Sequence, residues 1–151
     1  MDKVLIYEKV INDLSHYFQG YAIDRTAKMS IIASTLSNKF PDWIFCGFYR
    51  VVDEKLLEIG PYQSSIVPCA QIKFSNGVCG MSARQGKSII VDNVNNFDGY
   101  ISCDDQTISE IVIPVFSKDK LIGVLDIDGR LESQFDLTDK KYLEKIVGYL
   151  K

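Results

Sequence analysis

Hydrophobic residues recur at steps of three and four positions in three segments of the chain, which is the spacing of one helix face. The first segment covers residues 4–18. The second covers residues 24–40, between an aspartate that can cap a helix and a proline that stops one. The third begins near Thr138, where Leu137 and Tyr142 have the spacing of a hydrophobic staple around a Thr138 cap. We therefore predict two helices at the start and one at the end.

Apolar runs rich in branched and aromatic residues predict strands in the middle of the chain. Residues 44–52 and 56–59 flank a polar turn, which is typical of a hairpin. We expect Gly60-Pro61 to end this hairpin. Residues 66–74 predict another strand, interrupted early by Pro68, and residues 88–91 a short one.

A second hairpin is predicted from residues 111–116 and 121–128. A short helix over 78–85 and a polar loop over 92–109 precede it, and loops longer than about 12–15 residues are often functional. Strand pairs joined by tight turns imply an antiparallel sheet. The fold class is therefore α+β, with the terminal helices packed on one face of a central antiparallel sheet.

Composition narrows the range of partners. The length of 151 residues fits one domain, which we assign to residues 1–151. The net charge of −3 lacks the basic surplus of nucleic-acid-binding domains, so nucleic acid is not expected as a partner. No apolar run approaches the ~20 residues of a membrane helix, and the start lacks the pattern of a signal peptide. We expect a cytoplasmic protein without a membrane partner.

The four cysteines are Cys46, Cys69, Cys79 and Cys103. They form no CxxC pair, so neither a zinc site nor any other metal site is expected. Structural disulfides are rare in a reducing compartment. Cys46 lies within an aromatic strand and is expected to be a packing residue. The one histidine, His16, falls in the first helix and is expected to be a surface or packing residue rather than part of a catalytic dyad.

Two cysteines could carry chemistry. Cys103 lies in polar sequence, which makes it accessible, although Asp104 and Asp105 oppose the thiolate form. Cys79 opens a glycine-flanked helix, where the helix dipole favours a thiolate. The alternative for Cys79 is a small buried residue under a tight turn. Cys69, at a junction between loop and strand, fits either a structural or a reactive role.

Acidic residues gather at the ends of the second hairpin. Asp126 and Asp128 share one strand face because side chains alternate. They fit either a solvated face or a pair of carboxylates aimed at a cation or an amine. Glu110 begins the partner strand. A symmetric turn would place it opposite Ile127, on the other face, whereas an odd-length turn or a bulge at Pro114 would bring it beside the aspartates.

Six motifs together resemble a known family, the free methionine-(R)-sulfoxide reductases, which are built on a single GAF domain. The resemblance spans about Phe45 to Leu150 and rests mainly on the spacing of three cysteines and on the Asp-Ile-Asp strand end. The motifs are Gly60-Pro61-Tyr62-Gln63, Cys69, Gly77-Val78-Cys79-Gly80, Gly99-Tyr100-Ile101-Ser102-Cys103, Ser109-Glu110-Ile111-Val112 and Ile122-Gly123-Val124-Leu125-Asp126-Ile127-Asp128.

The resemblance implies thiol-dependent reduction of free L-methionine-(R)-sulfoxide. It assigns Cys103 as the residue that attacks the sulfoxide sulfur and becomes a sulfenic acid. Cys69 would resolve that acid by closing a disulfide, with Cys79 as an auxiliary cysteine. It also implies thioredoxin as the reductant and no bound cofactor. Because GAF domains often pair through terminal helices, a homodimer is compatible with the resemblance. The alternative function is a non-catalytic GAF module that binds a small ligand or senses oxidants.

The resemblance also assigns the substrate contacts. Glu110, Asp126 and Asp128 match acidic residues that hold the substrate, and Tyr49 matches an aromatic pocket residue. A carboxylic acid such as Glu110 suits protonation of the sulfoxide oxygen. An aspartate pair could select the free amino acid, because its ammonium group is absent from peptide-bound methionine.

Several positions depart from the family pattern, among them Ser64, which stands where a glycine is common, and one inserted residue before Cys69. Phe45 stands where the family usually has tryptophan, and Asn95 and Tyr100 stand where it has histidines. We expect a looser pocket wall at Phe45. Because alternation would put residues 43 and 45 on the same face, Trp43 is expected to cover part of the gap.

Overall fold

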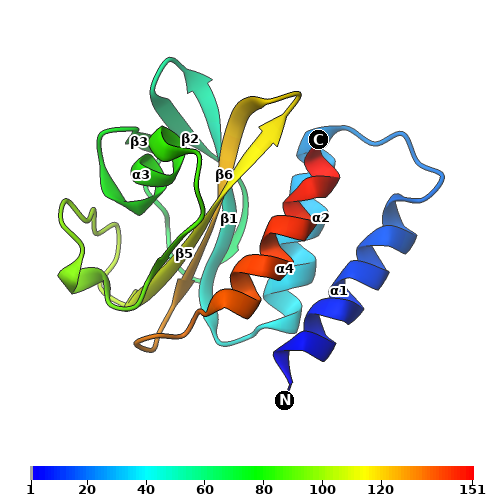
Figure 1. Ribbon diagram of the computed structural model, residues 1–151, viewed down its shortest axis with the longest axis horizontal. Helices are drawn as coiled ribbons and strands as arrows, with labels where there is room; N and C mark the ends of the chain where they lie inside the picture. The colour runs from blue at the N-terminus through cyan, green and yellow to red at the C-terminus, as the bar shows by residue number, and fades with distance from the viewer. Residues whose placement is uncertain (1) are drawn as a thin grey trace.

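The computed structural model describes residues 2–151, so Met1 of the predicted 1–151 domain lies outside the described residues. Its strands form one six-stranded antiparallel sheet in the order β3-β2-β1-β6-β5-β4 (Figure 1). The helices are α1 (Lys3–Phe18), α2 (Arg25–Lys39), α3 (Gly77–Gln85) and α4 (Leu137–Val147), with 3-10 turns at Val94–Asn96 and Gly148–Leu150. The strands are β1 (Trp43–Asp53), β2 (Leu56–Ser64), β3 (Gln71–Lys73), β4 (Ile89–Val91), β5 (Ser109–Ser117) and β6 (Lys120–Gly129).

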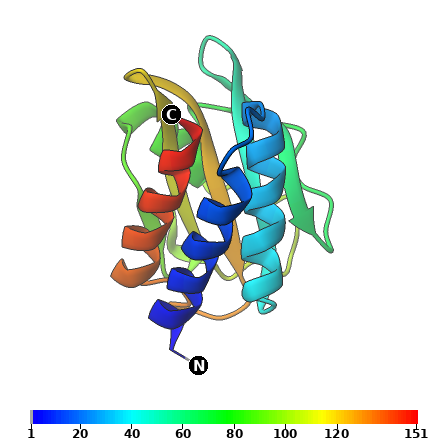
Figure 2. The same ribbon diagram turned by 90° about the vertical axis from the view of Figure 1, so that its right-hand side faces the viewer.

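Helices α2 and α4 cover one face of the sheet, α1 packs on the outside against both of them, and α3 lies on the other face (Figures 1 and 2). The predicted α+β class and the packing of the terminal helices on one face are therefore confirmed. Alternation divides each central strand between two apolar clusters. Cys46 and Phe48 of β1 pack under the helices, whereas Phe45 and Tyr49 pack on the opposite side, beneath α3. In residues 2–151 no helix has the length and apolar character needed to cross a membrane.

The helix starts are set by aspartate caps. Asp24 caps α2 as predicted, and its side chain accepts the backbone N–H three residues later at 2.8 Å. The prediction that Thr138 caps the last helix is wrong. Asp136 and Asp139 form a capping box there instead, since each carboxylate accepts a backbone N–H of the other residue. Leu137 is 75% exposed and forms no staple.

Strand β2 continues through Gly60-Pro61 to Ser64, so the predicted break there is wrong. The register between β1 and β2 shifts at this point, which leaves Gly60 and Pro61 opposite Phe48 in a bulge. A bulge leaves a residue unpaired in the ladder, so it tolerates the missing N–H of proline. The strand predicted over 66–74 is reduced to β3, and residues 65–70 form a loop that carries Cys69.

A second bulge reverses the direction of Trp43. The register between β1 and β6 shifts between Trp43 and Phe45, so these side chains lie on opposite faces. Trp43 stacks on Phe40, with ring centroids 4.2 Å apart, and lies against Phe135 in the helix-side core. The prediction that Trp43 covers the wall beside Phe45 is therefore wrong, because a bulge breaks the alternation on which it depended.

Candidate active site

A cavity of about 40 Å³ lies on the α3 side of the sheet. β1, β5 and β6 form its floor, α3 one wall, and the loops that carry Cys69 and Cys103 its mouth. All eight site residues predicted from the sequence line it, together with six apolar or aromatic residues, one glycine and one further aspartate. The lining residues are Phe45, Tyr49, Ile66, Pro68, Cys69, Ile72, Gly77, Val78, Cys79, Tyr100, Ile101, Cys103, Asp104, Glu110, Asp126 and Asp128.

The register of the second hairpin places Glu110 beside the aspartates. Glu110 pairs with Asp128, because the register shifts by one residue between Val115 and Phe116. Of the arrangements that the sequence allowed, the structure therefore has a bulge, which lies one residue beyond Pro114. Three carboxyl groups from two adjacent strands consequently face the same cavity.

The acidic groups are buried without a basic partner. Glu110 and Asp126 are only 5% and 6% exposed. No lysine or arginine is among the described residues that line the cavity. Burial raises the pKa of Asp126 to about 6. Burial, followed by the neighbouring carboxylates, raises the pKa of Glu110 and of Asp128 well above the usual range. Oδ1 of Asp126 is buried and has no hydrogen-bond partner. The cavity therefore favours a bound proton donor or cation.

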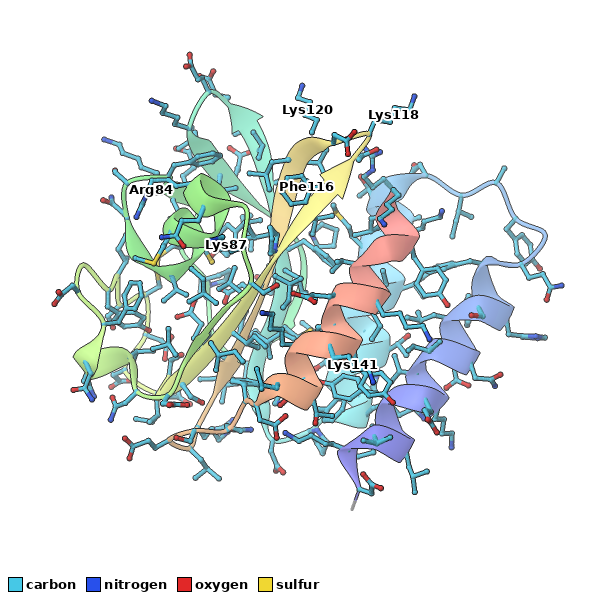
Figure 3. All side chains as sticks on the ribbon, viewed as in Figure 1. Arg84, Lys87, Phe116, Lys118, Lys120 and Lys141 are labelled. Carbon is cyan, nitrogen blue, oxygen red and sulfur yellow. A yellow bond between two sulfur atoms is a disulfide. The ribbon has the colours of Figure 1, made fainter. Side chains whose placement is uncertain are left out.

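Basic side chains lie on the outer surface instead. Figure 3 shows Arg84 and Lys87 near α3, and Lys118 and Lys120 at the β5–β6 turn, around the partly exposed Phe116. These exposed groups do not line the cavity and leave its carboxylates uncompensated.

Cys79 is a neutral buried thiol. It lies in the first turn of α3, 2% exposed, with its sulfur 4.0 Å from Oε1 of Glu110. Burial raises the pKa of Cys79 well above its usual value, and the charges of Asp126 and Glu110 raise it further. The alternative of a small buried residue therefore describes Cys79 better than a thiolate does, because desolvation outweighs the helix dipole.

Cys69 and Cys103 form a disulfide at the mouth of the cavity, with Cα atoms 5.5 Å apart. This is the pairing that the resemblance implies, and its Cα separation lies in the usual range. Cys103 is exposed, as predicted, and Cys69 is half-buried. Cys46 is a free thiol in the helix-side core, which agrees with its prediction as a packing residue. His16 is exposed on α1, across the sheet from the cavity.

Sequence reasoning missed the role of Asp104. Its carboxylate accepts the backbone N–H groups of Gln106 and Thr107, at 2.6 and 2.8 Å, and the Thr107 hydroxyl at 3.0 Å. These bonds fix the backbone directly after Cys103 and bring a further negative charge to the cavity. An aspartate followed three residues later by threonine is a local turn signal that could have indicated this arrangement.

Aromatic side chains line the remaining wall. Phe45 stacks on Tyr62, with ring centroids 5.7 Å apart. The Tyr49 hydroxyl donates to the backbone carbonyl of Cys69 at 2.9 Å and so holds the loop beside the disulfide. Of the two positions where the family has histidines, Tyr100 lines the cavity, whereas Asn95 is exposed and does not.

Comparisons with known proteins show which family the chain resembles. The GAF domain family matches residues 23–150. GAF domain-containing protein A of Dictyostelium discoideum is 34% identical over 144 residues, covering 95% of this chain and 89% of the relative. The free methionine-R-sulfoxide reductase of Escherichia coli is 34% identical over 142 residues, covering 92% and 85%.

Among solved structures, the free methionine-R-sulfoxide reductase of Neisseria meningitidis, in complex with its substrate, superimposes with a TM-score of 0.92. It is 34% identical, and the match covers 99% of this chain and 89% of that one. The shared fold, the extent of these matches and the clustered cysteines and acids lead to one conclusion: the chain belongs to the GAF-domain family of free methionine-R-sulfoxide reductases.

Proposed function

We propose that this chain reduces free L-methionine-(R)-sulfoxide to methionine, with Cys103 as the attacking cysteine. The observation that carries the proposal is the Cys69–Cys103 disulfide at the mouth of a cavity with an acidic floor. A disulfide is the expected product when one thiol reduces a sulfoxide and a second thiol resolves the resulting sulfenic acid.

The reaction begins with proton transfer. Burial raises the pKa of Glu110 well above its ordinary value, which favours the protonated form that can donate to the sulfoxide oxygen. The sulfur of Cys103 then attacks the substrate sulfur. The hydroxyl passes from the substrate sulfur to the Cys103 sulfur while the Cys103 thiol returns a proton to Glu110, so methionine is released and Cys103 becomes a sulfenic acid. The Cys69 thiol displaces this oxygen as water and forms the disulfide. The substrate gains two electrons, and the two thiols lose two.

Selectivity for the free amino acid comes from charge. Asp126 and Asp128 face the cavity without a basic partner among its described lining residues, so they can receive the ammonium group of the substrate. A peptide-bound methionine sulfoxide lacks this group and would leave the buried carboxylates unpaired. Phe45 and Tyr49 offer aromatic surface to the methyl and thioether groups.

Turnover requires an external dithiol to reopen the disulfide. We take thioredoxin as that reductant, acting in the cytoplasm, and no bound cofactor is needed. Cys79 is the auxiliary cysteine in this scheme, because its thiol lines the same cavity. A homodimer stays compatible with the scheme, since every proposed catalytic residue comes from one chain.

The decisive experiment offers the R and S epimers of free methionine sulfoxide separately, with NADPH oxidation coupled through thioredoxin reductase and thioredoxin. We expect turnover with the R epimer only. Cys103→Ser should abolish it, because a serine hydroxyl is not ionised at neutral pH. Cys46→Ser is the matched control and should retain activity, since Cys46 lies across the sheet. Absence of turnover with either epimer, combined with saturable binding of another small ligand, would favour the non-catalytic module instead.

A further inference from the structure

Three possible metal-ligand atoms, from α3, β5 and β6, converge in the floor of the cavity. The sulfur of Cys79 and one carboxylate oxygen each from Glu110 and Asp126 lie within 4.8 Å of one another. All three residues are buried. We infer that this trio is a binding site for a divalent transition-metal ion of the zinc type.

A second observation points to a missing positive charge. Asp126 is 6% exposed, and its buried Oδ1 has no hydrogen-bond partner. A buried carboxylate oxygen without a hydrogen-bond partner carries a desolvation cost, which a cation in contact with it offsets. Since no lysine or arginine is among the described lining residues, that cation has to come from outside the chain.

The donor set selects the metal. Mg²⁺ and Ca²⁺ prefer oxygen ligands alone, whereas Zn²⁺ accepts a thiolate together with carboxylates. Zn–S and Zn–O bonds in a tetrahedral site separate sulfur and oxygen by roughly 3.6 Å. The sulfur of Cys79 and Oε1 of Glu110 lie 4.0 Å apart, so a small side-chain movement closes the site. Asp128 lines the same cavity and, like water, can supply a fourth ligand.

Binding exchanges a proton for the metal without any redox change. The S–H bond of Cys79 breaks, a sulfur–zinc bond forms, and the proton passes to solvent. Glu110 releases its proton in the same way.

One functional consequence rests on the proposed function. The metal would engage Asp126, one of the two aspartates assigned to the substrate ammonium, so Zn²⁺ should inhibit the reduced enzyme competitively with methionine sulfoxide. Binding itself is independent of turnover and is measured on the oxidised protein. The Cys69–Cys103 disulfide removes two other thiols there as ligands, leaving Cys79 and Cys46.

The test titrates the oxidised protein with Co²⁺, whose bond to a thiolate gives a sulfur-to-metal charge-transfer absorption in the near ultraviolet. We expect a saturable band in the wild type and in Cys46→Ser, and its loss in Cys79→Ser. Asp126→Asn should retain a thiolate and weaken Co²⁺ binding by at least about tenfold. This second variant keeps the test valid if Cys79→Ser does not fold.

The proposal is overturned if the wild type shows no saturable band, if the band depends on Cys46, or if Asp126→Asn binds Co²⁺ as well as the wild type. A protein that binds Co²⁺ through Cys79 but never reduces methionine sulfoxide would overturn the proposed function and leave the metal site standing. A protein that reduces methionine sulfoxide but shows no Co²⁺ band would overturn the metal site and leave the proposed function standing.

Discussion

Asp128 is the residue best placed to test substrate recognition by charge. It pairs across the sheet with Glu110, lines the cavity and is only half-buried, so its replacement disturbs packing less than that of Asp126. The proposed ammonium contact can therefore be removed without creating a void.

Asp128→Asn should raise the KM for free methionine sulfoxide. A hydrogen bond to a charged group is worth about 1.5–3 kcal/mol, which corresponds to roughly 10- to 150-fold. Steady-state kinetics measure the change. Asp119→Asn, on the exposed turn of the same hairpin, is the matched control and should leave KM unchanged. Reduction of N-acetylated methionine sulfoxide as efficiently as the free form would contradict the ammonium contact.

Asp126 also makes the stability of the ligand-free protein depend on pH. Its folded-state pKa of about 6 lies above its ordinary value of 3.8, so the folded protein holds this proton more tightly than the unfolded chain. The stabilisation that this proton provides is complete below the pKa of Asp126 in the unfolded chain, and it is lost as the pH rises through about 6.

Asp126→Asn removes this pH-dependent loss of stability, because asparagine cannot ionise. We expect it to be more stable than the wild type above pH 7, by about 1–3 kcal/mol, with the difference vanishing near pH 4. Urea unfolding at a series of pH values measures the free energy of unfolding of both proteins. A difference of constant size across that range would show that the residue does not titrate as described.

At the scale of elements, β1 positions the aromatic wall through a close contact with β2. A Cβ atom on Gly47 would lie 2.3 Å from Cβ of Tyr62 and 2.9 Å from Cζ of Phe45. Only glycine therefore allows these two aromatic rings to stack beside the strand.

Gly47→Ala should force β1 and β2 apart and move Phe45. Overpacking of this kind typically costs about 1–3 kcal/mol, and we expect weaker substrate binding in addition. Thermal unfolding and KM are the measurements. Gly148→Ala is the control, because a Cβ at that αR position meets no atom within 4 Å. Equal stability of the two variants would mean that the contact is not tight.

The elements themselves were largely predictable, because helix periodicity and both hairpins depend on local sequence. Two of the failures depend on bulges. The bulge at Gly60-Pro61 extends β2, and the one between Trp43 and Phe45 reverses a side chain. Neither bulge can be recognised from the alternation of side chains along the strand. An inserted residue moves every side chain beyond it to the other face of the sheet.

The site was predictable in its residues but not in its geometry. Alternation placed Asp126 and Asp128 on one strand face but left a solvated face open, and the family resemblance supplied their role and the Cys69–Cys103 pairing. The position of Glu110 depended on a register that spacing could not decide. The neutral state of Cys79 depends on burial by distant segments, which outweighs the local helix dipole.

At the scale of the whole molecule, a buried network joins the first and last helices. The Asp139 carboxylate accepts from the Tyr7 hydroxyl at 2.7 Å and from Lys3 Nζ at 2.6 Å, and it also completes the cap of α4. This residue is 1% exposed, so its carboxylate oxygens depend on these partners for their hydrogen bonds.

Asp139→Asn should lower the free energy of unfolding by about 3 kcal/mol, because it leaves buried partners of the carboxylate unsatisfied. Asp136→Asn is the matched control. Its ion pair with Lys3 is exposed and contributes little, and asparagine is an equally good helix cap. Chemical denaturation of both variants measures the difference. Similar losses in the two would indicate that the network contributes no more than the cap.

The reversed direction of Trp43 determines what optical spectroscopy can detect. The chain has one tryptophan, and the sheet separates its indole from the cavity. Its intrinsic fluorescence should therefore report unfolding of the helix-side core and remain almost unchanged while methionine is titrated into the protein. Phe45→Trp would add a second fluorophore on the cavity wall, and the change in emission on adding methionine would then follow ligand occupancy alone.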